Sequence, residues 1–424
     1  MEMLERLLAS SMLSSFRRPG FVWLWMALTF NGFTNGVASV TFGWLALELT
    51  GSPVAVGTIF AVRNLPRLLF GVPIGALSDR MDRRRMLQGV NLLGAVMALA
   101  AAGLGLTGNL TFVGLLVVAF LEGAFDTVES TLGRTLVYDL VGGGEAVNGM
   151  ALEQLGNRGV GAAGSVAAGV LLAWYGSAAP FLCMSIAFVG AVAVLTLIPQ
   201  DLRSPTRHTS LPDAPARRAG EPSRLGTALK GFALLWRNPA VLLLAAIGAG
   251  AEIFAFSSEA LLPSFARDIL EVGETGLGNL TAARQIGGVA GLLTLAGLST
   301  RLRPGKLLLW MCGLFAVALI AFAGSASYAL SLFLMLGIGV AWAALDVLLP
   351  KLVQDRVPDG ERGAAVGIWN LSRGTGPLGS LETGAVAAAL GAPVAQVINA
   401  GVFLVVVIAA AVLQRAPRWR ISSS

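Results

Sequence analysis

Residues 53–106 decide the fold, and their sequence is PVAVGTIFAVRNLPRLLFGVPIGALSDRMDRRRMLQGVNLLGAVMALAAAGLGL. Two apolar runs, 53–77 and 86–106, are each long enough for a membrane-crossing helix, which needs about 20 such residues. The short loop between them carries four arginines. Because loops rich in lysine and arginine stay on the cytoplasmic side of a membrane, this stretch predicts a helical hairpin whose turn faces the cytoplasm.

The composition of the whole chain agrees with a membrane protein. Of its 424 residues, 55% are hydrophobic and 13% are charged, and the mean hydropathy is +0.74. A soluble domain has roughly 25% charged residues, so a water-soluble enzyme is excluded. Two cysteines and one histidine provide neither a disulfide framework nor a histidine-rich metal site. We therefore expect an all-α polytopic membrane protein with no cofactor and no bound metal.

Twelve apolar runs predict twelve transmembrane helices in two groups of six. An N-terminal bundle over 1–199 and a C-terminal bundle over 239–424 are separated by a proline-rich, mixed-charge cytoplasmic linker, 200–238. The predicted spans are 21–47, 53–77, 86–106, 111–135, 146–173, 178–198, 239–265, 276–298, 306–324, 328–351, 362–390 and 392–413.

The basic residues predict the orientation of these spans. If the N-terminus is cytoplasmic, the lysines and arginines of the loops and tails fall on the inner side, with Arg267 alone in an outer loop. Both termini are then cytoplasmic, and we expect a multi-pass protein of the bacterial plasma membrane. The net charge of +6 reflects this topology and contact with the lipid bilayer, not binding of nucleic acid.

The two halves share short sequence patterns in the same order, which indicates a duplicated six-helix unit. Such a duplication around a central site is transporter architecture. Small residues at every fourth position also form grooves into which another helix can pack closely. The matched patterns include Leu136-Val137-x-Asp139 with Leu352-Val353-x-Asp355, and Gly161-xxx-Ser165-xxx-Gly169 with Gly376-xxx-Ser380-xxx-Gly384.

The basic loop also resembles a known signature. Gly75-Ala76-Leu77-Ser78-Asp79-Arg80-x-Asp82-Arg83-Arg84-Arg85 is similar to the loop motif of the major facilitator superfamily, with Asp82 where glycine is commonest. Trp44-Leu45-x-Leu47-x-Leu49-Thr50-Gly51-Ser52 resembles the drug-exporter and enterobactin-exporter branch of that family, although the glycine-proline pair lies in the eleventh span, at Gly376-Pro377. The resemblance implies two six-helix bundles, with the first, fourth, seventh and tenth spans lining a central cavity.

The motif predicts a cytoplasmic gate. Asp79 can face the positive N-terminal end of a nearby helix, and the resemblance places the start of the eleventh span there. Such a contact would latch the halves in an outward-open state; the alternative is a loop that only sets topology. The predicted gate residues are Gly75, Asp79, Arg80, Arg83, Arg84 and Arg134.

Fourteen ionisable residues fall within the predicted spans, where charges must pair or face water. Glu122, Asp126 and Glu129 are spaced for a single helical face. Clustered carboxylates can hold a proton near neutral pH, and an arginine can compete with that proton. The predicted proton-coupling residues are Asp126 and Glu122, ranked first as mid-span groups, with Glu129 and Glu252. The candidate competitors are Arg63, Arg158, Arg284 and Arg373.

Interhelical salt bridges are the alternative role for these charges, and the better one for Arg134, Glu153 and Glu382 near helix ends. Aromatic residues inside the spans can stack on a substrate or simply pack. The predicted substrate cavity is lined by Asn31, Asn35, Arg63, Glu252, Phe254, Phe256, Glu259, Arg284, Trp342, Asp346, Trp369 and Arg373.

These features favour a transporter over an enzyme. No G-x-x-x-x-G-K-[ST] nucleotide loop occurs, so an ion gradient must supply the energy. Net acidity along the fourth, seventh and tenth spans favours a monomeric, proton-coupled exporter of cationic or zwitterionic amphiphiles, such as drugs. The alternatives are export of an anionic, metal-chelating or lipid-like compound and, from another class, a channel or a non-transporting receptor or membrane enzyme.

Overall fold

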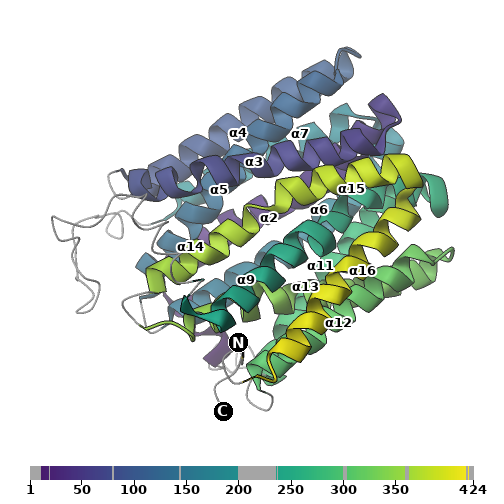
Figure 1. The fold of residues 1–424 in the computed structure, drawn as a ribbon. Helices are drawn as coiled ribbons and strands as arrows, with labels where there is room; N and C mark the ends of the chain where they lie inside the picture. The colour runs from purple at the N-terminus through teal and green to yellow at the C-terminus, as the bar shows by residue number, and fades with distance from the viewer. Residues whose placement is uncertain are drawn as a thin grey trace, which may run out of the picture.

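The computed structural model describes residues 11–18, 20–78, 81–142, 145–198, 235, 237–298, 303–358, 362–416 and 419. Within these ranges the chain forms helices and short connections (Figure 1). A 3₁₀ turn, η1 (Ser11–Arg17), leads into the N-terminal half. The helices of that half are α2 (Phe21–Thr50), α3 (Pro53–Ser78), α4 (Arg83–Leu106), α5 (Phe112–Val141), α6 (Ala146–Tyr175) and α7 (Ala178–Thr196).

The C-terminal half begins with an irregular rod. It consists of α9 (Pro239–Gly250), the π-helical η3 (Ala251–Ala255), the 3₁₀ η4 (Phe256–Leu261), α10 (Leu262–Ser264) and the π-helical η5 (Phe265–Ile269). The other helices are α11 (Gly273–Leu298), α12 (Pro304–Ala323), α13 (Tyr328–Gln354), α14 (Arg362–Arg373), α15 (Gly376–Leu390) and α16 (Ala392–Leu413). The helix ends lie within a few residues of the predicted span ends.

Two predicted spans depart from regular α-helix. The span predicted over 362–390 ends at Arg373 and restarts at Gly376. Pro377 explains this break, because proline lacks an N–H and disfavours helical geometry at the residue before it. In the seventh span, Pro263 likewise cannot donate to the carbonyl of Glu259, within the 3₁₀ segment. Both irregular segments lie in the C-terminal half.

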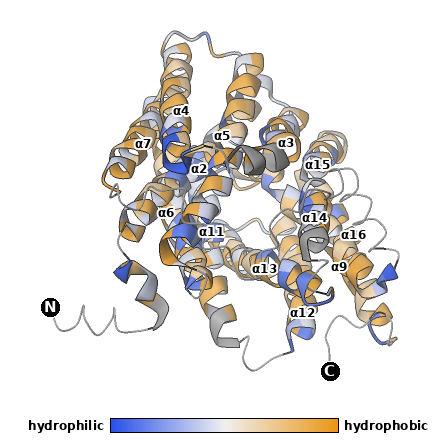
Figure 2. Ribbon diagram, turned by 90° about the vertical axis from the view of Figure 1, so that its left-hand side faces the viewer, coloured by the Kyte–Doolittle hydropathy of each residue, from blue (hydrophilic) through white to orange (hydrophobic). Residues whose placement is uncertain are grey.

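Six described segments are long and apolar enough to cross a membrane by length and composition alone: α4, α7, 239–269, α12, α13 and α16. The remaining long helices are richer in glycine and polar residues. They include α2 and α6, which meet α11 across the two halves, and α3, which meets α15 (Figure 2). The more polar helices thus lie at the centre, where the protein shields them from lipid.

Packing within the halves follows a common pattern. In the N-terminal half α3 packs on α5 and α4 packs on α7; in the C-terminal half α11 packs on α13 and α12 packs on α16. Each pair sits at the corresponding place in its half, as the internal sequence similarity predicts.

The two small-residue stripes are the places where the halves meet. Gly161, Ser165 and Gly169 of α6 receive α11, and Ser380 and Gly384 of α15 receive α3. At Gly57 of α3 a Cβ would lie 2.3 Å from the Ser380 carbonyl oxygen, so the backbones are in direct contact. The predicted role of these stripes as packing grooves is confirmed.

These contacts concentrate at one end of the bundle. α2 begins and α16 ends at what we call the near end, and the opposite end is the far end (Figure 1). Gly57 lies early in α3 and Gly384 late in α15, so both belong to the far end. There Arg267 also donates from Nη1 to the Leu47 carbonyl oxygen across the two halves, at 3.3 Å. The structure is therefore closed at the far end.

Candidate functional site

The charged residues of the spans form acid–arginine pairs near the interface of the two halves. Five carboxylates are matched with five guanidinium groups, and the two members of each pair come from different helices. The arginines predicted as competitors for these carboxylates, Arg63, Arg158, Arg284 and Arg373, are all in this set.

In the N-terminal half Arg63 of α3 binds Glu122 of α5 through two hydrogen bonds. Its Nε donates to Oε2 at 2.6 Å and its Nη2 to Oε1 at 3.0 Å. Nη2 also donates to Asn35 Oδ1 at 2.7 Å. This bidentate geometry is the strong form of an arginine–carboxylate contact, and the pair is almost fully buried.

Asp126 lies one turn along α5 and is held by two donors. Asn35 Nδ2 donates to Oδ1 at 2.8 Å, and Arg67 Nη2 donates to Oδ2 at 3.0 Å. Asn35 therefore links the Glu122 pair with the Asp126 pair. Arg67 is not among the predicted competitors; its position one turn after Arg63 in α3 was the available signal.

Arg284 forms a layered unit with two aromatic rings in the C-terminal half. Its Nη2 donates to Glu259 Oε1 at 2.8 Å, and its guanidinium lies 4.5 Å from the centre of the Trp342 ring. Trp342 is in turn stacked on Phe256, with ring centres 4.4 Å apart. Three predicted cavity residues thus pack on one another, and cation–π attraction orients Arg284.

One pair crosses between the halves. Arg158 Nη2 of α6 donates to Asp346 Oδ2 of α13 at 2.8 Å. Arg373, at the end of α14, lies 3.9 Å from Asp346 and 3.6 Å from Glu252. Glu252 and Asp346 therefore share Arg373, and Asp346 has a guanidinium on each side.

Three other predicted cavity residues lie outside the acid–arginine pairs. Trp369 lies 5.9 Å from the Arg373 guanidinium carbon, and Phe254 is partly buried against the hydrophobic core. Asn31 is 4% exposed, and neither polar atom of its side chain has a hydrogen-bond partner.

Two of these charged side chains are partly exposed at the interface of the two halves. The side chains of Arg67 and Asp126 are 42% and 22% exposed although both lie well inside their helices. Arg67 also lies within electrostatic range of Arg373 from the other half, so it faces the interface and not the outer surface. The Asp126 pair is therefore partly exposed where the two halves face each other.

The pairing corrects one sequence argument. Net acidity along the fourth, seventh and tenth spans predicts a cationic or zwitterionic substrate, but each of the carboxylates concerned has an arginine beside it: Glu122, Asp126, Glu252, Glu259 and Asp346. The local charge is balanced. A lone cation gains no net attraction from this arrangement.

Three end-of-span residues were expected in salt bridges, and for Glu382 this expectation is wrong. Glu382 accepts hydrogen bonds from Asn399 Nδ2 at 3.1 Å and from Thr383 Oγ1 at 3.3 Å. Glu153 is 9% exposed, Arg134 is exposed, and neither forms an ion pair among the described residues. Amide and hydroxyl donors replace the expected cation at Glu382.

The predicted gate is described in part. Asp79 and Arg80 lie outside the described residues, and Gly75 is placed only as part of α3. Arg83 Nη1 donates to Asp139 Oδ2 at 2.5 Å, and Arg84 Nε donates to the Leu195 carbonyl at 2.6 Å, both within the N-terminal half. Asp82 caps α4 by accepting from the backbone N–H groups of Arg84 and Arg85. Its presence in place of glycine thus has a structural reason.

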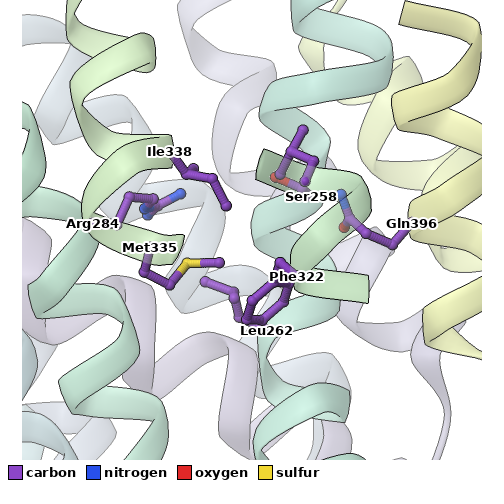
Figure 3. A pocket seen from close by; sticks show the side chains of 8 residues that line it. Ser258, Leu262, Arg284, Phe322, Met335, Ile338 and Gln396 are labelled. Atoms are coloured by element: carbon purple, nitrogen blue, oxygen red, sulfur yellow. The ribbon is translucent and has the colours of Figure 1, made fainter. Parts of the chain in front are cut away.

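A small pocket lies inside the C-terminal half, behind Arg284 (Figure 3). Its wall combines Arg284, Ser258 and Gln396 with apolar side chains such as Phe322 and Met335. It has no space large enough for a water molecule, so in this conformation it is a packing gap and not a substrate site.

Comparison with known proteins agrees with this architecture. The family model of the Major Facilitator Superfamily matches residues 24–377 and 253–423. The chain belongs to this superfamily and is a transporter, not an enzyme.

Two curated relatives are exporters or transporters by name. The multidrug efflux pump Tap of Mycolicibacterium fortuitum is 26% identical over 389 residues, covering 90% of this chain and 92% of the relative. The staphyloferrin A transporter of Staphylococcus aureus (strain NCTC 8325 / PS 47) is 24% identical over 355 residues, covering 82% and 84%.

Solved structures share the fold. The nucleoside transporter NupG (D323A mutant) aligns with a TM-score of 0.71 at 16% identity, covering 92% of this chain and 98% of that one. A POT family transporter in complex with 5-aminolevulinic acid aligns with a TM-score of 0.72 at 12% identity, covering 95% and 96%.

Proposed function

We propose that this protein is a proton-coupled exporter of amphiphilic compounds that carry a positive charge, above all zwitterions, and that it works by alternating access. The observation that carries this proposal is the set of matched acid–arginine pairs at the interface of the halves, with Asp126 and Arg67 partly exposed where the halves face each other. The relatedness to a multidrug efflux pump supports the direction of transport.

Balanced pairs suit an exchange mechanism. A substrate ammonium can take the place of Arg67 at Asp126, and a substrate anion can occupy the released guanidinium. A proton can also neutralise Asp126 and release Arg67, so substrate and proton compete for one carboxylate. With the termini in the cytoplasm, the far-end-closed structure is an inward-facing state, in which an exporter loads its substrate.

Proton coupling gives the exporter its driving force. If one net charge crosses the membrane per cycle, the membrane potential supplies about 2.3 kcal/mol per 100 mV. We assign the exchange to Asp126, with Glu122, Glu252 and Arg373 as the neighbouring groups that keep the site neutral.

The test measures proton release from detergent-solubilised protein during titration with cationic, zwitterionic and anionic amphiphiles. Zwitterions and cations should release protons from the wild type and not from Asp126→Asn. The matched control is Glu145→Gln, which removes a carboxylate from an exposed pair with Arg18. Equal proton release from Asp126→Asn and wild type would remove Asp126 from the mechanism.

A second candidate function is export of an anionic or metal-chelating compound. It is favoured by the number of arginines at the interface and by the relatedness to a staphyloferrin A transporter. In the same titration this function gives tight binding of anions without proton release, and the binding weakens in Arg67→Gln.

A further inference from the structure

Glu129 differs from the other two acidic residues on its face of α5. Glu122 and Asp126 bind arginines, whereas Glu129 has no cation partner among the described residues. Its side chain is 5% exposed, and Oε1 has no hydrogen-bond partner. An ionised carboxylate in such a place would lose its hydration without compensation, which is strongly unfavourable.

The neighbouring group on α4 is Asn91, a fully buried asparagine within hydrogen-bonding range of Glu129. Asn91 Nδ2 donates to the Leu87 carbonyl at 2.9 Å, which fixes the amide orientation and leaves Oδ1 as the free atom. Oδ1 has no donor. Glu129 Oε1 and Asn91 Oδ1 are thus two buried acceptors without a donor, on the neighbouring helices α5 and α4, and a proton on Glu129 removes its uncompensated charge.

The charged groups on the helices around α5 are engaged elsewhere. On α3, Arg63 and Arg67 bind Glu122 and Asp126, and on α4, Arg83 binds Asp139. On α6, Arg158 binds Asp346 across the interface, and the remaining charge, Glu153, lies near Arg134.

The helix α2 also brings no cation to Glu129, because Glu48 is its only charged residue. It does bring a second polar side chain. α2 and α5 run antiparallel, with Asn35 against Asp126 and Leu28 against Gly133. This register places Asn31, whose polar atoms have no partner, at the level of Glu129.

We propose that Glu129 is protonated in this far-end-closed state, is positioned by Asn91, and stores the coupled proton while Asp126, on the same face of α5, is bound to Arg67. Asn91 is then a positioning residue that holds the protonated carboxyl between α4 and α5. This inference rests on the proposed proton coupling, but the protonation of Glu129 can be tested independently of it.

Infrared difference spectroscopy on the full-length protein tests the protonation. The wild type should show the C=O stretch of a protonated carboxyl, shifted in D₂O, and Glu129→Gln should lose it. Glu122→Gln is the matched control on the same helix face and should keep the band, because Glu122 is bound by Arg63 through two hydrogen bonds and is not the group proposed to hold the proton. Asn91→Leu should move the band to higher frequency, because the C=O and O–H of the acid lose a hydrogen-bond partner. A band that survives in Glu129→Gln, or that Asn91→Leu does not move, would overturn the inference.

Transport in proteoliposomes tests the coupling. Glu129→Gln should retain substrate exchange at equal pH and lose accumulation driven by a pH gradient, falling to the level of vesicles without a gradient. Full accumulation by Glu129→Gln contradicts the coupling role. If substrate accumulation by the wild type does not depend on the pH gradient, the proposed function is refuted. The infrared band still decides whether Glu129 is protonated.

Discussion

Adding a methyl group at Gly57, where α3 contacts α15, should open the far end of the transporter. In Gly57→Ala the new Cβ would lie 2.3 Å from the Ser380 carbonyl oxygen, about 1 Å inside ordinary van der Waals contact. The new Cβ is attached to the backbone of α3, and the carbonyl oxygen belongs to the backbone of α15. Because neither can shift alone, the two helices must move apart. The clash exists only while the far end is closed, so the substitution penalises one state and not the other.

The expected size of the shift follows from overpacking energies. A clash of this kind costs about 1–3 kcal/mol, which changes the ratio of far-end-open to far-end-closed molecules by roughly 5-fold to 150-fold. Gly169→Ala at the equivalent contact on α6 would place a Cβ 2.6 Å from the Glu274 carbonyl oxygen. Because the two contacts are separate, the double variant should add the two penalties, reaching about 2–6 kcal/mol.

The assay is a distance measurement between spin labels at the far end, on Asn109→Cys and Ser327→Cys, after Cys183 and Cys312 are replaced by serine. Gly57→Ala should shift the distribution toward longer distances. Gly159→Ala is the matched control, because a Cβ at Gly159 meets nothing within 4 Å. Unchanged distances in the double variant would refute the idea that these stripes hold the far end closed.

Three further predictions concern other contacts. Asp82→Ala should lower the unfolding free energy by about 0.5–2 kcal/mol through loss of the α4 cap, measured as a lower thermal unfolding midpoint, while Asp268→Ala in η5, which caps no helix N-terminus, should not. Arg158→Gln and Asp346→Asn should be non-additive in transport rate by about 0.5–3 kcal/mol, since they remove one ion pair; additive effects would mean the pair is not used in the cycle. Arg67→Gln should increase substrate-driven proton release, because Asp126 loses its cation, and unchanged release in a titration would contradict the competition model.

Much of the fold was predictable because long apolar runs and short polar loops constrain membrane helices strongly. The predicted span 392–413 matches α16 in full, and the span 21–47 differs from α2 by three residues at its end. The break before Gly376 had a local signal in Pro377, but the π-helical turns of the seventh span had none. They depend on how this rod packs against α15 and α16, which sequence periodicity does not record.

The residues that make up the candidate site could be predicted from the sequence, but the contacts that each of them forms could not. Glu122 and Arg63 were both expected at the centre, yet their bidentate contact depends on the register of α5 against α3, which no spacing within one helix specifies. Asn91 was overlooked although it and Gln88 are the two amides of the otherwise apolar span 86–106. A polar residue in an apolar span was the signal that could have found it.

The balance of charge at the interface limits what the transporter can accept. If a plain cation displaces Arg67 from Asp126, the freed guanidinium needs a new anion, and the nearest one in the other half, Glu252, already shares Arg373 with Asp346. A proton on Asp126 creates the same unpaired arginine. A zwitterion removes the difficulty, because its ammonium and its anionic group replace both members of the pair at once and leave the site neutral. Zwitterions should therefore bind more tightly than simple cations to the wild type. In Arg67→Gln this order of binding affinities should reverse, and a binding titration with both kinds of compound measures it directly.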